Sequence, residues 1–351
     1  MITWSKVQSA NIDHIFSGAQ ADVTNASDKF FLFKLNDDSL NMVLGRMGKL
    51  ELISFSYTSK KAKKLVKSID LKSTKFTLEF SSTTSVTILF GISGLKLCYI
   101  SDKHSVLNTG YFVPIKEFNL HLKADHGKDR SFKDCVLHLM DVLDLSKIDV
   151  LQIGYESVEP NPDDVCRIIE GFKVDCLFID DMCGPDIATY FLTRLGPSVK
   201  HLRSWKNFSD NSETFYEIIL GNFDTTTFSR SLQMSLDDIL SMNCRSAIVT
   251  AGGNSDVLIN RFMKNWIRGG SRRIEYIIII GDAGPDRAVV MKGVEYQVAN
   301  HNRPRVFRHT VRPTNVPIEN VVTGGYDIRR RDGIIATVRV LCSYVEIFVW
   351  N

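Results

Sequence analysis

The chain has 351 residues, of which 44% are hydrophobic and 24% are charged. That length indicates two or three domains, and the composition is typical of a folded globular protein rather than a disordered one. The net charge of +3 is too small to indicate a protein whose main partner is nucleic acid, so we expect no such partner.

The chain has no apolar run as long as the roughly 20 residues of a membrane-spanning helix, so we expect no membrane association. The first residues lack the apolar core of a signal peptide. The seven cysteines are scattered and form no Cys-x-x-Cys pair, which predicts reduced thiols rather than disulfides or a metal site. These features predict a cytoplasmic or nuclear protein.

The most informative segment runs from Leu35 to Ile69 and contains an amphipathic stretch, a short apolar turn and a basic stretch. The apolar residues of the first stretch recur at intervals of three and four, which predicts one face of a helix. They are Leu40, Val43, Leu44 and Met47. Asp37 and Asp38 suit the start of this helix, and Gly48 suits its end.

The basic stretch predicts a second helix over Lys60–Ile69, capped by Ser56 or Thr58 and carrying five lysines. Those lysines could contact phosphates, form a solvated helix face or complement an acidic protein partner. A segment of about 35 residues is too short to bury a core of its own. We therefore expect it to dock on another part of the chain or on another protein.

The rest of the chain alternates between strand and helix signals. Residues 73–130 predict a β-rich segment, because apolar and polar side chains alternate along them. Residues 131–282 alternate helix and strand signals, and the strands repeat about every 24–26 residues up to Val199–Leu202, after which the pattern resumes at Leu236. The predicted helices are Phe132–Leu145, Asp163–Phe172, Asp186–Leu195, Leu236–Met242 and Asp256–Ile267. The short period favours a solenoid over a doubly wound α/β domain. Residues 283–351 predict a β meander, because Asp332-Gly333 separates two alternating runs.

Enzyme motifs are weak throughout the chain. An apolar strand ends in Asp180 and Asp181, but the chain has no GxxxxGK(S/T) phosphate-binding loop. The glycine-rich turn at Gly281–Pro285 lacks the GxGxxG spacing of a dinucleotide site. We therefore expect no catalytic residues, no metal and no cofactor.

Two stretches resemble a known family. FFLFKLN followed by VLGRMGKLELISFSYTSKKAKKLVKS, within Phe30–Lys72, is similar to the F-box. SLDDILSMNCRSAIV and the later pattern N-R-F-x-K-x-W-I-x-G, which ends in E-Y, resemble the F-box-associated domain of type 2. The residues of that pattern are Asn260, Arg261, Phe262, Lys264, Trp266, Ile267, Gly269, Glu275 and Tyr276. The chain is identified as a member of the nematode-expanded family that pairs these two domains.

The residue patterns and the resemblance together predict an α/β fold in several parts. A flexible leader (1–28) precedes a small helical F-box (29–72) and the β segment. The following strand–helix region would be a leucine-rich-repeat-like solenoid that includes the F-box-associated domain, at about 217–282, and ends in the β meander.

The resemblance also implies the substrate-recognition subunit of a Skp–cullin–F-box ubiquitin ligase, which performs no chemistry itself. The F-box would bind the Skp adaptor, and through it a cullin, with seven apolar residues. They are Leu35, Leu40, Val43, Leu44, Met47, Leu52 and Ile53. Phe31, Asn36 and Lys49 stand where the family often has prolines. The alternative is a repeat-type protein-interaction module with a vestigial F-box and no ligase role.

An unidentified target protein would then bind the C-terminal region. The candidate contacts are residues that we expect to be exposed at strand ends: Tyr155, Asp180, Asp181 and Trp205. Tryptophan is enriched among interface anchors, although Trp205 suits the core equally well.

Overall fold

The computed structural model describes residues 32–81, 84–91, 93–101, 110–115, 131–154, 161–206, 212–281, 283–309 and 318–350. Within these ranges the fold is mixed α/β, with N-terminal helices followed by a large mixed sheet. The chain divides into two compact units, residues 1–73 with 95–145 and residues 74–94 with 146–351. The predicted leader and Tyr155 lie outside the described residues.

The F-box segment forms three α-helices after a short 3-10 turn, η2 (Leu32–Lys34). They are α1 (Asp37–Arg46), α2 (Lys49–Ser56) and α3 (Lys60–Ser68). The prediction of a short apolar turn between two helices is therefore wrong, because α2 occupies those residues. Leu52, Ile53 and Phe55 of α2 are all buried, so this short helix lacks the one-sided apolar pattern that would have revealed it.

Polar groups satisfy the first backbone N–H groups of each helix. The side-chain oxygen of Asn36 accepts the N–H of Ser39 at 2.9 Å, and that of Ser59 accepts the N–H of Ala62 at 3.1 Å. The N–H of Gly48 donates to the Glu51 carboxylate at 2.6 Å. Two predicted boundaries are thereby corrected: Ser59 rather than Ser56 or Thr58 caps α3, and Gly48 begins α2, since α1 already ends at Arg46.

The first unit also contains helix α4 (Phe132–Val142) and two paired antiparallel strands, β3 (Ser93–Ser101) and β4 (Gly110–Ile115). Helix α4 packs against the F-box helices, because Val142 joins their apolar cluster. The buried F-box members of that cluster are Leu40, Leu44, Leu52, Phe55, Ala62 and Val66. The F-box segment therefore buries much of its apolar surface within this chain.

In the second unit, a row of parallel strands follows the order of the chain. The strands are β5 (Lys147–Ile153), β6 (Lys173–Ile179), β7 (His201–Ser204), β8 (Thr225–Phe228), β10 (Ser246–Ala251) and β11 (Tyr276–Ile280). The two-residue strand β9 (Gln233–Met234) pairs with the end of β10. No reversal of strand order interrupts this described part of the sheet, as it would in a doubly wound domain.

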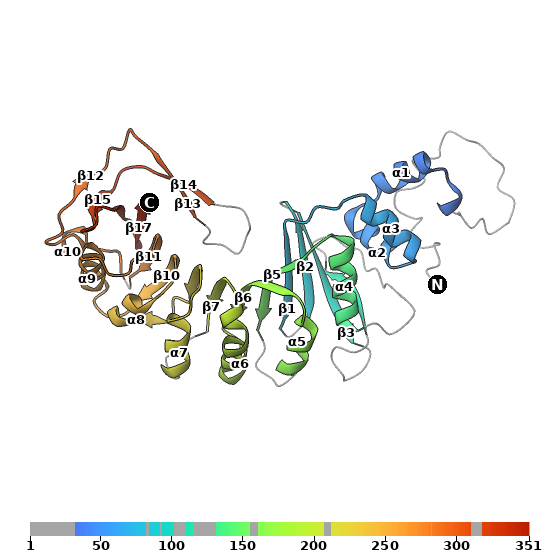
Figure 1. Cartoon of the computed structure of the whole chain (residues 1–351), viewed down its shortest axis with the longest axis horizontal. Coiled ribbons are helices and arrows are strands. Elements are labelled where there is room, and N and C mark those ends of the chain that lie inside the picture. The colour runs from blue at the N-terminus through green and yellow to red at the C-terminus, as the bar shows by residue number, and fades with distance from the viewer. Residues whose placement is uncertain are drawn as a thin grey trace. The chain divides into compact units, whose positions relative to one another are not determined.

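The connecting helices lie along one side of these strands, and consecutive helices contact each other (Figure 1). They are α5 (Pro162–Ile169), α6 (Pro185–Leu195), α7 (Ser212–Ile219), α8 (Leu236–Ser241) and α9 (Ser255–Ile267), with a short turn η3 (Gly196–Ser198) after α6. Helix α7 and strand β8 form a complete unit that the sequence prediction missed. The other side of the sheet carries none of these helices, so we call it the helix-free face.

The same spacing of buried residues recurs at each of the six parallel strands, at positions i, i+3 and i+5. In β5 these residues are Ile148, Leu151 and Ile153, all 0% exposed. The corresponding sets are Val174, Leu177 and Ile179; Val199, Leu202 and Ser204; Phe223, Thr226 and Phe228; Cys244, Ala247 and Val249; Ile274, Ile277 and Ile279. Successive strand residues point to opposite faces, so the residues at i+3 and i+5 share the face under the helices, and the residue between them occupies the helix-free face. The residue at position i lies near or before the start of each strand and is buried as well.

Antiparallel strands extend the sheet of the second unit at both ends. β1 (Lys75–Phe80) pairs in parallel with β5 and antiparallel with β2 (Ser85–Phe90). Beyond β11 come β17 (Tyr344–Trp350), β16 (Ile335–Val340), β15 (Tyr326–Arg329) and the edge strand β12 (Gln297–Val298), all antiparallel to their neighbours. The hairpin predicted at Asp332-Gly333 is present, and Gly333 has the positive φ of 92° that such a turn requires.

A separate two-stranded sheet, β13 (Arg305–His309) with β14 (Ile318–Val322), was not predicted. Phe307 and Val322 form an apolar cluster with Tyr276 and Phe348 of strands β11 and β17. The small sheet therefore covers one end of the helix-free face.

Candidate functional site

The seven predicted adaptor-binding residues are brought together by the F-box helices, but most of them face inward. Leu40, Leu44, Leu52 and Ile53 are at most 4% exposed. The half-buried Leu35, Val43 and Met47 pack against the same cluster. Burial in a packed core leaves no surface for a partner, so direct adaptor contact by the first four would require the helices to separate.

The surface left over by this packing is an apolar margin, which we define as Phe33, Leu35, Met42, Val43 and Met47. Met42 is 62% exposed and Phe33 is 39% exposed. The Phe33 ring stacks on Phe55 at 5.9 Å between centroids, which ties η2 to α2. The sequence reasoning missed Phe33 and Met42, because it selected positions by helical periodicity, and periodicity identifies the face that becomes the core.

The basic surface of α3 adjoins this margin. The ammonium group of Lys61 lies 5.0 Å from the centroid of the Phe33 ring. Residues 32–74 contain nine lysines and arginines and four carboxylates, a net charge of +5, whereas the whole chain has +3. An exposed apolar margin beside excess positive charge suits a partner with an apolar groove and an acidic rim.

Two of the α3 lysines are used within the chain. Lys63 and Lys67 both pair with Asp141 of α4, each at 2.6 Å. Their hydrogen bonds and charges lower the pKa of Asp141 to about 2. Lys60, Lys61 and Lys64 remain exposed on the outer side of the helix.

A second joint connects α2 to α4. The Ser56 hydroxyl donates to the backbone carbonyl of Ile53 at 2.6 Å and lies 2.8 Å from Nε2 of His138. Because the single hydroxyl proton is used on Ile53, His138 donates from Nε2. The Tyr57 ring stacks on His138 at 3.8 Å, and its hydroxyl donates to the carbonyl of Cys135. These contacts give His138 a structural role.

The second candidate surface is the helix-free face at the carboxyl ends of β6 and β7. Trp205 follows β7 directly and is 42% exposed, and its backbone N–H donates to the carbonyl of Ile179 at 2.9 Å. Asp180 follows β6 and is half-buried, whereas Asp181 is exposed. The structure therefore places these three predicted target-binding residues at neighbouring strand ends, and resolves the two readings of Trp205 in favour of the surface.

Asp180 and Asp181 form an acidic pair. Burial, together with the hydrogen bond to Asp181, raises the pKa of Asp180, and the same hydrogen bond lowers the pKa of Asp181. The amide of Gln152 donates to Asp180 at 3.3 Å.

Arg203 of β7 and Phe178 of β6 belong to the same surface, and the sequence reasoning missed both. They are direct register partners. The guanidinium carbon of Arg203 lies 5.0 Å from the Phe178 ring centroid and 5.8 Å from the Trp205 ring centroid. The two rings meet edge to face at 4.7 Å. We call Phe178, Arg203 and Trp205 the aromatic–arginine stack.

A row of charged side chains runs along the opposite edge of the parallel strands, where each strand begins. It consists of Asp149, Asp175, Lys200, Asp224, Arg245 and Glu275, one residue for each strand. Backbone hydrogen bonds join its neighbours, for example Asp224 N–H to Lys200 at 2.7 Å and Glu275 N–H to Arg245 at 2.7 Å. Lys147 lies 3.4 Å from Asp149 and also pairs with Asp175.

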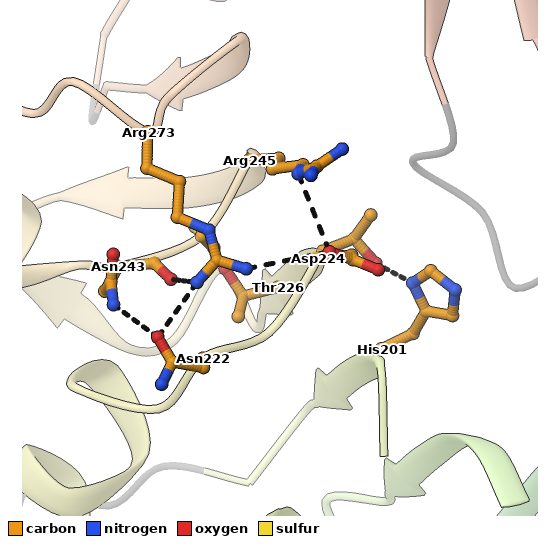
Figure 2. A network of polar contacts seen from close by, with 9 residues as sticks. His201, Asn222, Asp224, Thr226, Asn243, Arg245 and Arg273 are labelled. Atoms are coloured by element: carbon orange, nitrogen blue, oxygen red, sulfur yellow. Dashed lines mark hydrogen bonds and ion pairs between the residues drawn. The ribbon is translucent and has the colours of Figure 1, made fainter.

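The centre of this row extends into the polar network shown in Figure 2. Both Arg245 and Arg273 lie 3.7 Å from a carboxylate oxygen of Asp224. Arg273 also donates to the side chain of Asn222 at 3.0 Å and to the carbonyl of Asn243 at 2.8 Å. These contacts tie three loops together, which indicates that the network stabilises the edge of the sheet.

The residues of the C-terminal sequence pattern are mainly structural. Phe262 and Trp266 are 1% exposed, and the Arg330 guanidinium lies 5.1 Å from the Trp266 ring centroid. The Asn260 amide donates to the carbonyls of Val290 at 2.7 Å and Lys292 at 2.9 Å. The sequence pattern therefore marks residues that pack α9 against the segment containing Val290 and Lys292.

Within the described ranges, no group of three or more His, Cys, Asp or Glu side chains could hold a metal ion. None of the helices in that part of the chain has both the length and the apolar character of a membrane span.

Comparison with known proteins finds two family models in the order that the sequence predicted. Residues 32–74 match the F-box domain, and residues 214–279 match a model described as F-box associated. A Caenorhabditis elegans protein, "F-box associated domain-containing protein sdz-33", is 24% identical over 257 residues, which cover 71% of this chain and 78% of that protein. No solved structure matches the chain. Both domain matches and this relative show that the chain is similar to nematode-type F-box proteins with an F-box-associated domain.

Proposed function

We propose that this protein is the substrate-recognition subunit of a Skp–cullin–F-box ubiquitin ligase. Its F-box would bind the Skp adaptor, the adaptor would recruit a cullin, and the C-terminal region would hold a target protein. Such a subunit performs no chemistry and acts by raising the concentration of the target near the ligase. A role in the cytoplasm or the nucleus is consistent with this proposal.

The observation that carries the proposal is the F-box match over residues 32–74, which fold into three packed helices and leave the apolar margin exposed. Side chains of this size contribute about 1.5–3 kcal/mol each when fully buried in an interface, before the cost of association is subtracted. The apolar margin and the adjacent lysines could therefore form an adaptor interface while the F-box helices stay packed. Among the seven predicted residues, Leu35, Val43 and Met47 remain the candidates for direct contact.

We further propose that the strand–helix region is a leucine-rich-repeat-like solenoid that binds the target on its helix-free face. The uninterrupted order of the parallel strands and the recurring i, i+3, i+5 sets of buried residues support the solenoid. Solenoids commonly bind partners on extended surfaces of this kind. The candidate target contacts remain Asp180, Asp181 and Trp205, together with Tyr155.

Adaptor binding is tested with the full-length chain and a purified Skp-type adaptor in a pull-down, followed by titration. Met42→Glu is the most informative variant, because this side chain is 62% exposed and its substitution spares the core. A charge in the apolar margin is expected to weaken adaptor binding by at least about tenfold. The matched control is Leu220→Glu, since Leu220 is 59% exposed and lies outside the F-box.

Wild-type binding that is lost in Met42→Glu and kept in Leu220→Glu supports the ligase role. A folded wild-type protein that does not bind the adaptor rules it out. Leu44→Asp is unsuitable as a test, because Leu44 is 1% exposed and its charged variant would unfold the helices whether or not an adaptor binds.

One observation favours the second candidate, a protein-interaction module with a vestigial F-box. Leu40, Leu44, Leu52 and Ile53 are buried, and the cluster of the F-box helices is completed by Val142 of α4. An F-box whose apolar side chains are satisfied within its own chain has less to gain from an adaptor. The same pull-down separates the two candidates.

A further inference from the structure

Arg203 is a half-buried cation without an acidic partner. In the described part of the chain it makes two ring contacts, with Phe178 and Trp205, and no hydrogen bond or ion pair. A guanidinium removed from part of its water without compensation costs free energy, so such groups are normally paired. The rings hold its plane in place and leave its N–H edge available.

The four strand positions next to Arg203 on the helix-free face carry no carboxylate. Its register partners are Phe178 on β6 and Thr227 on β8. Along its own strand the same-face neighbours are His201 and Trp205. Burial lowers the pKa of His201, which favours the neutral imidazole. No carboxylate therefore lies at the four positions around the guanidinium.

A second half-buried cation, Lys75 of β1, adds to the positive potential of this face. Burial lowers the pKa of Lys75, and the charge of Arg203 lowers it further. The same charge acts on Cys176, the β6 residue on the same face two positions before Phe178. Burial raises the pKa of the Cys176 thiol to about 12, and the charge of Arg203 opposes that rise. Two like charges held in a partly dry environment would both gain from a bound anion.

The chemistry around the stack favours a carboxylate over a phosphate. A planar guanidinium edge can donate two parallel hydrogen bonds to either group. Asp180 follows β6 at the next position on the same face as Phe178, beside Trp205, and Asp181 comes directly after it. This acidic pair repels a doubly charged phosphate more strongly than a singly charged carboxylate. Trp205 adds an exposed apolar surface for the stem of an acidic side chain.

We propose that the aromatic–arginine stack is the anchor point for the target protein and binds an aspartate or glutamate side chain in an acidic segment of that target. The inference rests on the proposed function in one respect, namely that the helix-free face receives a target. The carboxylate forms a two-point contact with Arg203, and Trp205 covers it from one side.

The test uses the full-length protein and fluorescein-labelled peptides, with fluorescence anisotropy as the readout. The probe is a short peptide of alternating glutamate and serine. Its two counterparts replace glutamate by glutamine or by phosphoserine. Thermal melting confirms that each protein variant is folded.

We expect saturable binding of the glutamate peptide that weakens with salt, and weaker binding of both counterparts. Arg203→Met keeps a side chain between the rings but removes the charge, and should weaken binding by at least about tenfold. Arg203→Lys keeps the charge without the planar fork, and should weaken it by about threefold. Arg245→Met is the matched control, because it removes the same charge from a 58% exposed side chain at the opposite edge of the sheet.

Thr227→Glu provides an independent test if Arg203→Met fails to fold. It places a carboxylate at the register partner of Arg203 and should compete with the peptide, again weakening binding by about tenfold. The proposal is overturned if the glutamate peptide shows no saturable binding, if both Arg203→Met and Thr227→Glu bind as the wild type does, if Arg245→Met loses as much affinity, or if the phosphoserine peptide binds more tightly.

The same proteins separate this inference from the ligase role. Arg203→Met should bind the Skp-type adaptor normally, and Met42→Glu should bind the glutamate peptide normally. A wild-type protein that binds the peptide but no adaptor would end the ligase proposal and leave the anchor point standing. The reverse result would leave the F-box functional and overturn the anchor point.

Discussion

The F-box helices and the strand–helix region solve the same problem, burial of apolar side chains, in different ways. In the F-box, three short helices converge on one cluster to which α4 contributes Val142. In the strand–helix region, each strand contributes three buried residues, and these residues lie next to those of the neighbouring strands. The free surface therefore differs: an apolar margin with lysines on the F-box, and a polar and aromatic face on the sheet.

This difference implies that the two faces of the sheet respond differently to substitution. Leu177 is 0% exposed under the helices, and Leu177→Ala should lower the free energy of unfolding by about 3 kcal/mol through lost contacts and a cavity. Arg203→Met, one strand away on the helix-free face, should change it by less than about 0.5 kcal/mol. Urea denaturation measures both, and equal losses would contradict the assignment of the two faces.

The small sheet β13–β14 is held by a buried hydroxyl, which provides a second test. Thr337 Oγ1 accepts from Arg305 at 2.6 Å and from the Trp350 indole at 2.7 Å, and it donates to Asp327 at 2.6 Å. Thr337→Val keeps the shape but removes the acceptor of the Trp350 indole N–H, whereas Arg305 still pairs with Asp327 at 2.7 Å, so the change should cost about 1–2 kcal/mol. The backbone amides of β13 and β14 should exchange with solvent faster in this variant. In Thr337→Ser, which keeps the hydroxyl, they should remain mostly protected from exchange. Unchanged exchange in the valine variant would show that the apolar contacts of Phe307 suffice.

In the F-box, stability depends on helix caps because the helices are short. Asn36 caps α1, and its side chain accepts the N–H of Ser39 at 2.9 Å. Asn36→Ala should lower the free energy of unfolding by about 1 kcal/mol, and Asn36→Asp, which can still cap, by much less. The measurement is the urea midpoint followed by circular dichroism. A neutral alanine variant would mean that the cap adds nothing to the packing of α1.

The smallest effect is expected at the Asp141 bridge between α3 and α4. The folded pKa of about 2 lies below the ordinary value of 3.8, so the stabilisation is complete above about pH 4 and is lost as the pH falls towards 2. The carboxylate is 46% exposed, so screening by water limits the effect to less than about 1 kcal/mol. Asp141→Asn should therefore be slightly less stable than the wild type at pH 7 and equally stable near pH 2. A difference that persists at pH 2 would assign it to packing.

Local patterns predicted many of the elements. The helices α1, α3, α4, α5, α6, α8 and α9 and most strands of the second unit lie near their predicted residues, because strong periodicity and caps mark them. Helix α2 was missed because its apolar residues are spread around the helix rather than along one side, and β8 was missed because threonines occupy positions that its neighbours fill with aliphatic residues. The spacing of Phe223, Thr226 and Phe228 carries the missing signal, and only comparison with the other strands reveals it.

The candidate sites depend on contacts between residues that are far apart in the sequence. Periodicity marked Leu40 and Leu44 as apolar, but whether such residues meet a partner or their own chain depends on the distant Val142. Arg203 became significant only when the register placed Phe178 on one side of it and Thr227 on the other. Pairing across strands is a long-range property that a reading along the chain cannot supply.

The row of charges at the strand beginnings limits how this protein can change in evolution. Loss of the strand that carries Lys200 would bring Asp175 beside Asp224, and loss of the strand that carries Arg245 would bring Asp224 beside Glu275. Like charges on adjacent strands repel each other unless a cation bridges them, as Lys147 bridges Asp149 and Asp175. Removal of either unit would therefore be penalised even if the apolar sets still matched. Each strand–helix unit is thus suited to its own neighbours, so the order of the units is fixed and they are not interchangeable.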